Sequence, residues 1–203
     1  MDVYSNMNET FKIKYRKLLE ILPDVAQCAG EKLVLVGGTA LSLFYFNHRL
    51  SIDLDFVPIE GDETMHKEML KGCLSKKGYR TIIGAFKNQF IIQFEDVSTK
   101  IEIFKPNQKI KKVEKKIFGG TELLVASLED ILKMKIDAYK ERKEARDAFD
   151  IYFILKSKEE SLDELYSLLR KFGKPKNIEL LSLLVLDKNE IKLFKKVVDD
   201  ASS

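Results

Sequence analysis

The residues of this 203-residue chain that are best suited to chemistry are two aspartates, Asp53 and Asp55. They lie in a short apolar segment that reads as a strand, in which residues two apart point to the same side. Two carboxylates on one face repel each other unless a cation lies between them, and an all-oxygen donor set suits Mg²⁺ or Mn²⁺. We therefore expect Asp53 and Asp55 to be metal ligands.

A pair of glycines precedes these aspartates, directly after the apolar run 33–36. Gly37 and Gly38 would let backbone amides approach a phosphate closely, and we expect a short helix to begin there. A lone Gly-Gly is usually a tight turn, and a lone D-x-D is usually a solvated strand edge. Together, in this order, they predict phosphoryl or nucleotidyl transfer.

The two segments also carry a family resemblance. GGTAL at 37–41 and HRLSIDLDF at 48–56 resemble the nucleotidyltransferase superfamily, and within it the AbiEii/AbiGii toxin-type enzymes. The resemblance implies that the hydroxyls of Thr39 and Ser51 join the two glycines in binding the nucleotide, since a hydroxyl can bond a phosphate. It leaves Arg49 either to brace the aspartates or to touch the substrate.

Nucleotidyltransferases usually supply a third carboxylate from a neighbouring strand. Glu102 is the best candidate, because it alternates with two isoleucines and so faces away from the apolar side. Glu95, across a predicted hairpin, is the second candidate. An exposed strand glutamate with no role in the site is an equally ordinary interpretation.

A second signature lies between Lys135 and Asp150, in the sequence KIDAYKERKEARDAFD. It resembles the later motifs of the toxin family. By that resemblance Lys135 would hold nucleotide phosphate, and Asp150 or Asp147 would act in catalysis or nucleotide positioning. A lysine can neutralise triphosphate charge, and an acid near the metal could accept a proton. A charged amphipathic helix would show a similar pattern.

The spacing of this signature makes a structural demand. Lys135 and Asp150 would lie about 22 Å apart in one unbroken helix. To serve one site they require a break between Lys140 and Arg146, after which Asp147 would cap the next helix. Local propensity does not predict this break, because Glu, Arg, Lys and Ala all favour helix.

Composition narrows the class of protein only modestly. The chain is 45% hydrophobic with a net charge of +3, which is ordinary for a globular protein. The run 105–116 holds six lysines and one acid; it is either a solvated hairpin or linker, or a surface that attracts RNA or nucleotide phosphate.

Cysteine usage and hydropathy bear on the compartment. Cys28 and Cys73 have no motif of a zinc site or disulfide framework, and free cysteines fit a reducing compartment. No apolar run is long enough to span a membrane, and the first twenty residues lack a signal-peptide core. The expected location is therefore cytoplasmic.

The periodicity predicts an α+β fold. Helices are expected at 11–29, with Pro23 breaking or kinking the first, and at 63–77, and strands at 33–36, 80–85, 90–95 and 100–104. From Ser127 onward the pattern is helical, with Ser127 and Asp130 forming a variant capping box. We expect a nucleotidyltransferase-like mixed-sheet domain at 1–120 and a helical bundle at 121–203 that completes the nucleotide cleft.

The expected reaction is metal-dependent transfer of a nucleoside monophosphate from an NTP to an acceptor hydroxyl. The resemblance implies that the acceptor is RNA, with tRNA as the first choice, and that the protein is a toxin with a separately encoded antitoxin, often linked to phage defence. Two alternatives stay open: a small-molecule, antibiotic-type nucleotidyltransferase, and a non-catalytic protein that only binds nucleotide.

Overall fold

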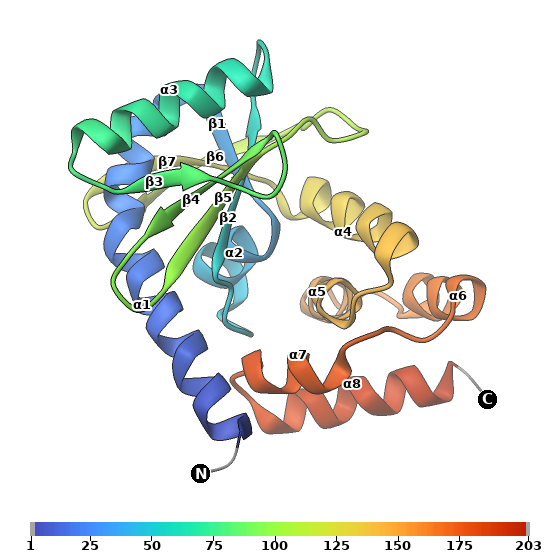
Figure 1. Cartoon of the computed structure of the whole chain (residues 1–203). Helices are drawn as coiled ribbons and strands as arrows, with labels where there is room; N and C mark the ends of the chain where they lie inside the picture. Colours follow the sequence, from blue (N-terminus) through green and yellow to red (C-terminus); the bar gives the residue numbers. More distant parts are fainter. Residues whose placement is uncertain (1–2, 202–203) are drawn as a thin grey trace. The chain divides into compact units, whose positions relative to one another are not determined.

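The computed structural model describes residues 3–201, with side chains from residue 9 onward, and these form two units (Figure 1). The first contains residues 3–40 and 51–127, and the second contains residues 41–50 and 128–201. The strand at 121–126 thus belongs to the first unit, and the segment 41–50 belongs to the helical one. The role of the units around a nucleotide stays a prediction.

One mixed β-sheet organises the first unit. In the described residues its strands have the spatial order β3-β4-β5-β2-β1-β7-β6. Two neighbouring pairs are parallel, β2 with β5 and β1 with β7, and the others are antiparallel. The strands are β1 (Leu33–Val36), β2 (Asp53–Pro58), β3 (Thr81–Ile83), β4 (Gln89–Gln93), β5 (Ser98–Ile103), β6 (Val113–Phe118) and β7 (Thr121–Ala126).

Helices α1 (Val3–Ala29) and α3 (Glu63–Lys76) pack on each other and on strands of this sheet. Pro23 lies inside α1 without ending it, so of the two expected effects, a break or a kink, the break does not occur. Helix α3 begins at Asp62, whose carboxylate accepts hydrogen bonds from the amides of Thr64 and Met65. The core of this unit contains the fully buried Leu54, Phe56, Ile101 and Ile103.

A disulfide joins the two helices, between Cys28 of α1 and Cys73 of α3. The prediction of free cysteines is therefore wrong. The two residues are 45 positions apart, and no sequence motif marks them as a pair. The cysteine argument for a reducing compartment no longer holds.

Strand β6 begins inside the lysine-rich run 105–116 and β7 follows it; neither was among the expected strands. Strand β6 is at the edge of the sheet, and its residues are alternately exposed and half-buried. It therefore lacks the apolar alternation that predicts a strand. Three lysines in or next to β6 are ion-paired, Lys112 and Lys116 to Glu114 and Lys115 to Glu31 and Glu122.

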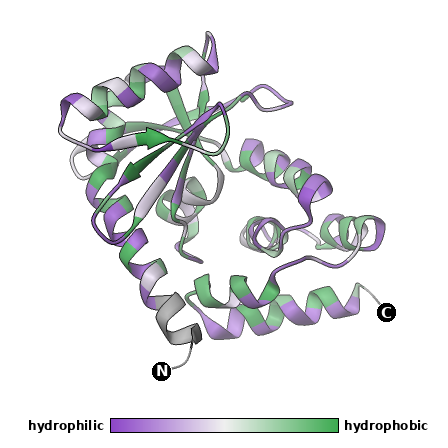
Figure 2. Cartoon of the chain, in the orientation of Figure 1, coloured by the Kyte–Doolittle hydropathy of each residue, from purple (hydrophilic) through white to green (hydrophobic). Residues whose placement is uncertain are grey.

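The second unit is helical. Its helices are α4 (Leu128–Arg142), α5 (Ala145–Ser157), α6 (Asp163–Phe172), α7 (Ile178–Leu184) and α8 (Lys188–Asp200), and the segment 41–50 includes the wide helical turn η2 (Ser42–Phe46). Hydrophobic and hydrophilic residues alternate along α8 (Figure 2), as expected for a helix with one buried side. Ile191, Phe194 and Val198 are its buried residues.

The segment 41–50 is held in this unit by backbone pairing with the last residue of α7 and the residues directly after it. The amide of Leu50 donates to the carbonyl of Leu184, and the amide of Leu186 donates to the carbonyl of His48. Between them Arg49 forms an antiparallel bridge with Val185.

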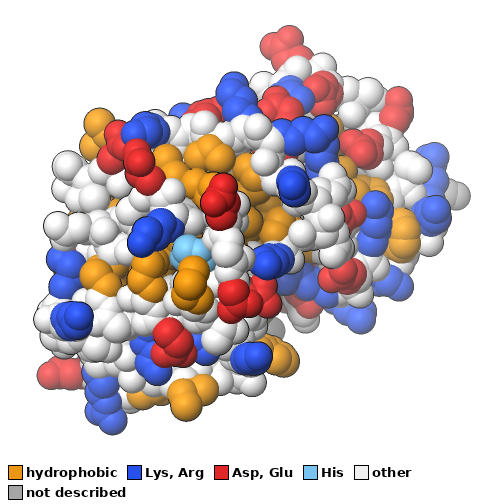
Figure 3. Space-filling model, turned by 90° about the horizontal axis from the view of Figure 1, so that it is seen from above, with side chains coloured by type: hydrophobic (Ala, Val, Ile, Leu, Met, Phe, Trp, Pro, Cys, Tyr) orange, Lys and Arg blue, Asp and Glu red, His pale blue; other side chains and the backbone are white. Residues whose placement is uncertain are grey.

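The surface shows no dominance of one charge on the face in Figure 3, where Lys and Arg side chains alternate with Asp and Glu around a group of hydrophobic side chains. Within residues 3–201, no helix has the length and apolarity needed to cross a membrane.

Candidate active site

The glycine turn lies directly against β2. Val36 is the register partner of Asp55, and the next residue, Gly37, begins the five-residue helix α2 (Gly37–Leu41) with a φ of +72°. A Cβ atom at Gly37 would lie 2.7 Å from Oδ2 of Asp55, closer than any ordinary contact. Both the positive φ and the close approach therefore require glycine here.

Two hydroxyls fix the turn to the start of β2. Thr39 is buried; its Oγ1 donates to the carbonyl oxygen of Asp53 and lies 2.9 Å from Oγ of Ser51. Thr39 and Ser51, both predicted to bind nucleotide, are thus brought together with Asp53. Their contacts support a role in positioning the turn.

Three carboxylates share one face of the sheet. Strands β2 and β5 are parallel, with Asp55 opposite Glu102 and Asp53 opposite Lys100. Register partners in a parallel pair point to the same side. Leu54 and Ile101 are fully buried on the opposite side. The expected alternation of polar and buried apolar residues at the start of β2 is confirmed, and the roles of the two aspartates stay a prediction.

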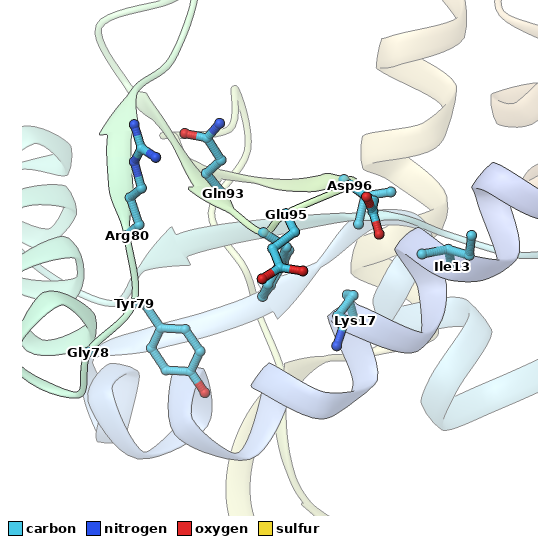
Figure 4. A pocket seen from close by; sticks show the side chains of 10 residues that line it. Ile13, Lys17, Gly78, Tyr79, Arg80, Gln93, Glu95 and Asp96 are labelled. Atoms are coloured by element: carbon cyan, nitrogen blue, oxygen red, sulfur yellow. The ribbon is translucent and has the colours of Figure 1, made fainter.

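Glu102 is fixed in place by two amides. Asn88 Nδ2 donates to its Oε1 over 2.9 Å, and Gln89 Nε2 donates to its Oε2 over 2.8 Å. Glu95, the second candidate, lies elsewhere: it lines a pocket of about 600 Å³ with Arg80 and Lys17 (Figure 4). The strand register therefore places Glu102, and not Glu95, beside Asp55.

Lys100 is a charged residue of this face that was not among the predicted site residues. Its ammonium lies 3.4 Å from Oδ2 of Asp53 and 3.6 Å from Oε2 of Glu102. The sequence does carry a signal for it, because Lys100 stands two residues before Glu102 in the same alternating strand.

The donor set of this face bears on whether a divalent cation could bind. Among the described residues, no group of three or more His, Cys, Asp or Glu side chains has the arrangement of a metal site. Asp53 and Asp55 offer oxygen donors on one face, and Gly37 lets the backbone of the turn pack directly against the carboxylate of Asp55. This pair has the chemistry that Mg²⁺ or Mn²⁺ requires, with Glu102 held next to it.

A cavity of about 530 Å³ is lined in part by Val57 and Val34. Val57 points to the same side of β2 as Asp55, because the two residues are two apart. Lys105 and Lys109 also line this cavity. Two of the six lysines in the run 105–116 thus lie beside a hollow of the sheet.

The second signature forms a separate buried cluster in the helical unit. Helix α4 ends at Arg142 and α5 begins at Ala145, with Lys143 between them at a φ of +56°. The predicted break is confirmed. It brings the ammonium of Lys135 to 2.7 Å from Oδ2 of Asp150 and 3.0 Å from Oδ1 of Asp147.

Asp150 is fully buried and surrounded by donors. Besides Lys135, the guanidinium of Arg49 makes two hydrogen bonds of 2.7 Å, one to each of its oxygens. His48 Nε2 lies 2.9 Å from Oδ1. Burial alone would raise the pKa of Asp150, but Arg49 and Lys135 hold that pKa well below its usual value of 3.8.

Asp147 does not cap α5 as predicted. The N-cap position is Glu144, which makes no side-chain capping bond. The carboxylate of Asp147 turns instead to cations on α4, accepting from Arg142 Nε over 2.6 Å and from Lys135. These charges lower its pKa against the raising effect of burial.

His48 is buried and stacks on Phe149, with ring centroids 5.7 Å apart. Burial lowers the pKa of His48, and the neighbouring Asp150 only partly opposes this. Its Nδ1 has no hydrogen-bond partner among the described residues. A neutral ring that donates from Nε2 to Asp150 satisfies this geometry.

Comparison with known proteins gives this geometry a context. Residues 20–201, most of the chain, match the sequence model of a family described as the nucleotidyl transferase AbiEii toxin of a type IV toxin–antitoxin system. No protein of curated function shows significant sequence similarity to the chain.

Two solved structures share the fold. JHP933 from Helicobacter pylori is 22% identical with a TM-score of 0.54, and the match covers 93% of this chain and 94% of JHP933. An antigenic nucleotidyltransferase-like protein from Paracoccidioides brasiliensis is 16% identical with a TM-score of 0.54, covering 82% of this chain and 92% of that one. The predicted α+β, nucleotidyltransferase-like fold is confirmed.

Proposed function

We propose that this chain, which belongs to the AbiEii nucleotidyl transferase toxin family, moves a nucleoside monophosphate from an NTP to an acceptor hydroxyl and releases pyrophosphate. The protein is a nucleotidyltransferase; the details of the reaction are the proposal. The observation that carries it is the pair Asp53 and Asp55 on one face of β2, with Gly37 against Asp55.

Asp53 and Asp55 are the proposed ligands of Mg²⁺ or Mn²⁺, with Glu102 as the third carboxylate of the site. When bound, the cation would offset the negative charge that develops on the transferred phosphate. The amides of Asn88 and Gln89 orient Glu102 toward this face. In this proposal Asp53 and Asp55 bind the cation, and Asn88 and Gln89 hold Glu102 beside them.

The proposed phosphate site is the backbone at Gly37 and Gly38. The absence of side chains here allows a phosphate to reach the amide groups. Thr39 and Ser51 support this site by joining the turn to the carbonyl of Asp53. A buried Thr39 hydroxyl that is already engaged is better suited to hold the turn than to meet the triphosphate directly.

In the helical unit, Lys135 is the proposed phosphate ligand. Its ammonium is paired with both Asp147 and Asp150, which fix its position. The full burial of Asp150 and its bonds to Arg49 support a positioning role for this carboxylate, acting through Lys135 and Arg49. Asp147, tied to Lys135 and Arg142, has the same kind of contacts.

The proposed acceptor is RNA, with tRNA as the first choice, and the proposed partner is an antitoxin protein; a link to phage defence and a cytoplasmic location belong to the same proposal. The family's description as part of a toxin–antitoxin system supports the antitoxin. Lys105 and Lys109, beside the cavity next to Val57, supply positive charge that would attract an RNA backbone.

The test uses the purified full chain, each of the four labelled NTPs, Mg²⁺ and total RNA. We expect label to enter RNA only with metal present. Asp53→Asn and Asp55→Asn should each abolish incorporation with unchanged circular dichroism, since neither side chain lies in the core. Near-normal incorporation by both variants would contradict the site, and label on a small molecule instead of RNA would contradict the acceptor.

A further inference from the structure

Lys100 is a cation placed among the carboxylates that the proposed function assigns to a metal. Its ammonium is 3.4 Å from Asp53 and 3.6 Å from Glu102, and it comes from the strand position directly opposite Asp53. A third of its side chain is exposed, 33%. It is therefore both close to the carboxylates and reachable from solvent.

The contacts of Lys100 are loose. Charge-assisted hydrogen bonds between nitrogen and oxygen are about 2.7–2.9 Å long, and both of these distances are longer. Partly exposed ion pairs of this kind stabilise a fold little. By contrast, Lys135 lies 2.7 Å from the fully buried Asp150. Lys100 thus compensates charge without being locked to one partner.

The surroundings keep Lys100 between its partners. Both oxygens of Glu102 already accept hydrogen bonds from Asn88 and Gln89. These bonds restrain the Glu102 carboxylate, so it does not move Lys100 away from Asp53. The backbone of Asp53 is held by the Thr39 hydroxyl, which donates to the Asp53 carbonyl. The positive charge of Lys100 consequently stays beside the proposed ligand Asp53.

We infer that Lys100 makes the site selective for the metal–triphosphate complex over the bare divalent cation. This inference rests on the proposed function. The ammonium repels a bare cation at Asp53, because two like charges about 4 Å apart interact appreciably even in water. It attracts the complex, which carries the negative charge of the phosphates. Lys100 is in this sense a specificity-determining residue for the form of the substrate.

The test measures Mn²⁺ binding to the full chain by the electron paramagnetic resonance signal of free Mn²⁺, with and without a non-hydrolysable α,β-methylene NTP. Lys100→Met should bind bare Mn²⁺ about tenfold more tightly than wild type, and should bind the Mn²⁺–nucleotide complex several-fold more weakly. Lys100→Arg keeps the charge and should stay close to wild type in both titrations.

Lys115→Met is the matched control. Lys115 also lies between two carboxylates, Glu31 and Glu122, but on the edge strand β6, and its replacement should change neither affinity. Lys100→Gln replaces Lys100→Met if thermal denaturation shows that the methionine variant does not fold.

The outcomes separate this inference from the proposed function. If Asp53→Asn abolishes Mn²⁺ binding while Lys100→Met leaves both affinities at the wild-type value, the metal site stands and the role of Lys100 is overturned. If wild type binds no Mn²⁺ in either titration, the proposed metal site fails, and this inference fails with it.

Discussion

The guanidinium of Arg49 donates hydrogen bonds to both carboxylate oxygens of Asp150. Nε lies 2.7 Å from one oxygen and Nη2 lies 2.7 Å from the other. The two residues are 101 positions apart in the sequence, and both are buried. A bidentate arginine fixes direction as well as distance. This pair therefore anchors the segment 41–50 to helix α5.

Asp150→Asn should destabilise the helical unit strongly. The neutral amide would take the shared carboxylate away from the buried Arg49 and leave Lys135 with Asp147, and breaking a buried pair in this way lowers stability by about 3–5 kcal/mol. Urea unfolding followed by circular dichroism would measure the loss.

The control for this change is Asp199→Asn. Asp199 pairs with Lys174 at 3.4 Å, and both side chains are more than half exposed. Its replacement should alter the free energy of unfolding by less than about 0.5 kcal/mol. Equal changes in the free energy of unfolding for the two variants would show that the buried Asp150 cluster stabilises the fold no more than an exposed ion pair.

The stability of the helical unit should fall as the pH falls below about 6.5. Burial lowers the pKa of His48, so below its usual pKa of 6.5 the unfolded chain takes up a proton that the folded one does not. The lowered pKa values of Asp147 and Asp150 act in the same direction below pH 3.8. Each group can contribute at most about 1.4 kcal/mol per pH unit.

The measurement is the free energy of unfolding between pH 8 and pH 5, for wild type and His48→Gln. The glutamine variant removes the titrating ring, so its stability should vary less steeply with pH. A slope as steep as that of wild type would assign the pH dependence to other groups.

Gly37→Ala should reduce nucleotidyl transfer on the order of 100-fold. The new methyl group would meet Oδ2 of Asp55 at 2.7 Å and displace it, and small displacements of a reacting group have effects of this size. Gly120→Ala is the control, because Gly120 has a φ of +78° but nothing within 4 Å of its Cβ position.

Comparing the two alanine variants separates backbone strain from crowding. Both should lower stability through the positive φ, by about 1–2 kcal/mol. Only Gly37→Ala should lose transfer activity. Full activity in Gly37→Ala would mean that the position of Asp55 does not matter for the reaction.

Removing the disulfide should destabilise the first unit. Cys28 and Cys73 close a loop of 45 residues, for which the loop-entropy model gives about 4 kcal/mol. Denaturation of wild type with and without dithiothreitol would show the difference, and the double variant Cys28→Ser with Cys73→Ser should be insensitive to the reductant. Identical curves for oxidised and reduced wild type would contradict the cross-link.

The sequence predicted the elements whose signals are local. The strand Leu33–Val36 was located to the residue, because four apolar residues end at a glycine pair. Helix α3 was located to within one residue at its end, since Gly78 follows it at a typical C-terminal position. The break before α5 followed from the distance between Lys135 and Asp150, although local propensity argued against it.

What the sequence did not predict depends on distant partners. The disulfide and the pairing of Arg49 with Asp150 join residues that are far apart along the chain. Strand β6 exists because β7 pairs with it, and β7 because it pairs in parallel with β1. No periodicity within one segment can reveal such partners.

The helical unit has a further consequence for how the protein is made. Its segment 41–50 is synthesised before α5. At usual rates of synthesis, about 5–20 s pass between the synthesis of His48 and Arg49 and that of Asp150. During that interval their binding sites do not yet exist. A gene fragment encoding only residues 128–203 would lack these ten residues permanently, and its product would carry Asp150 without two of its donors.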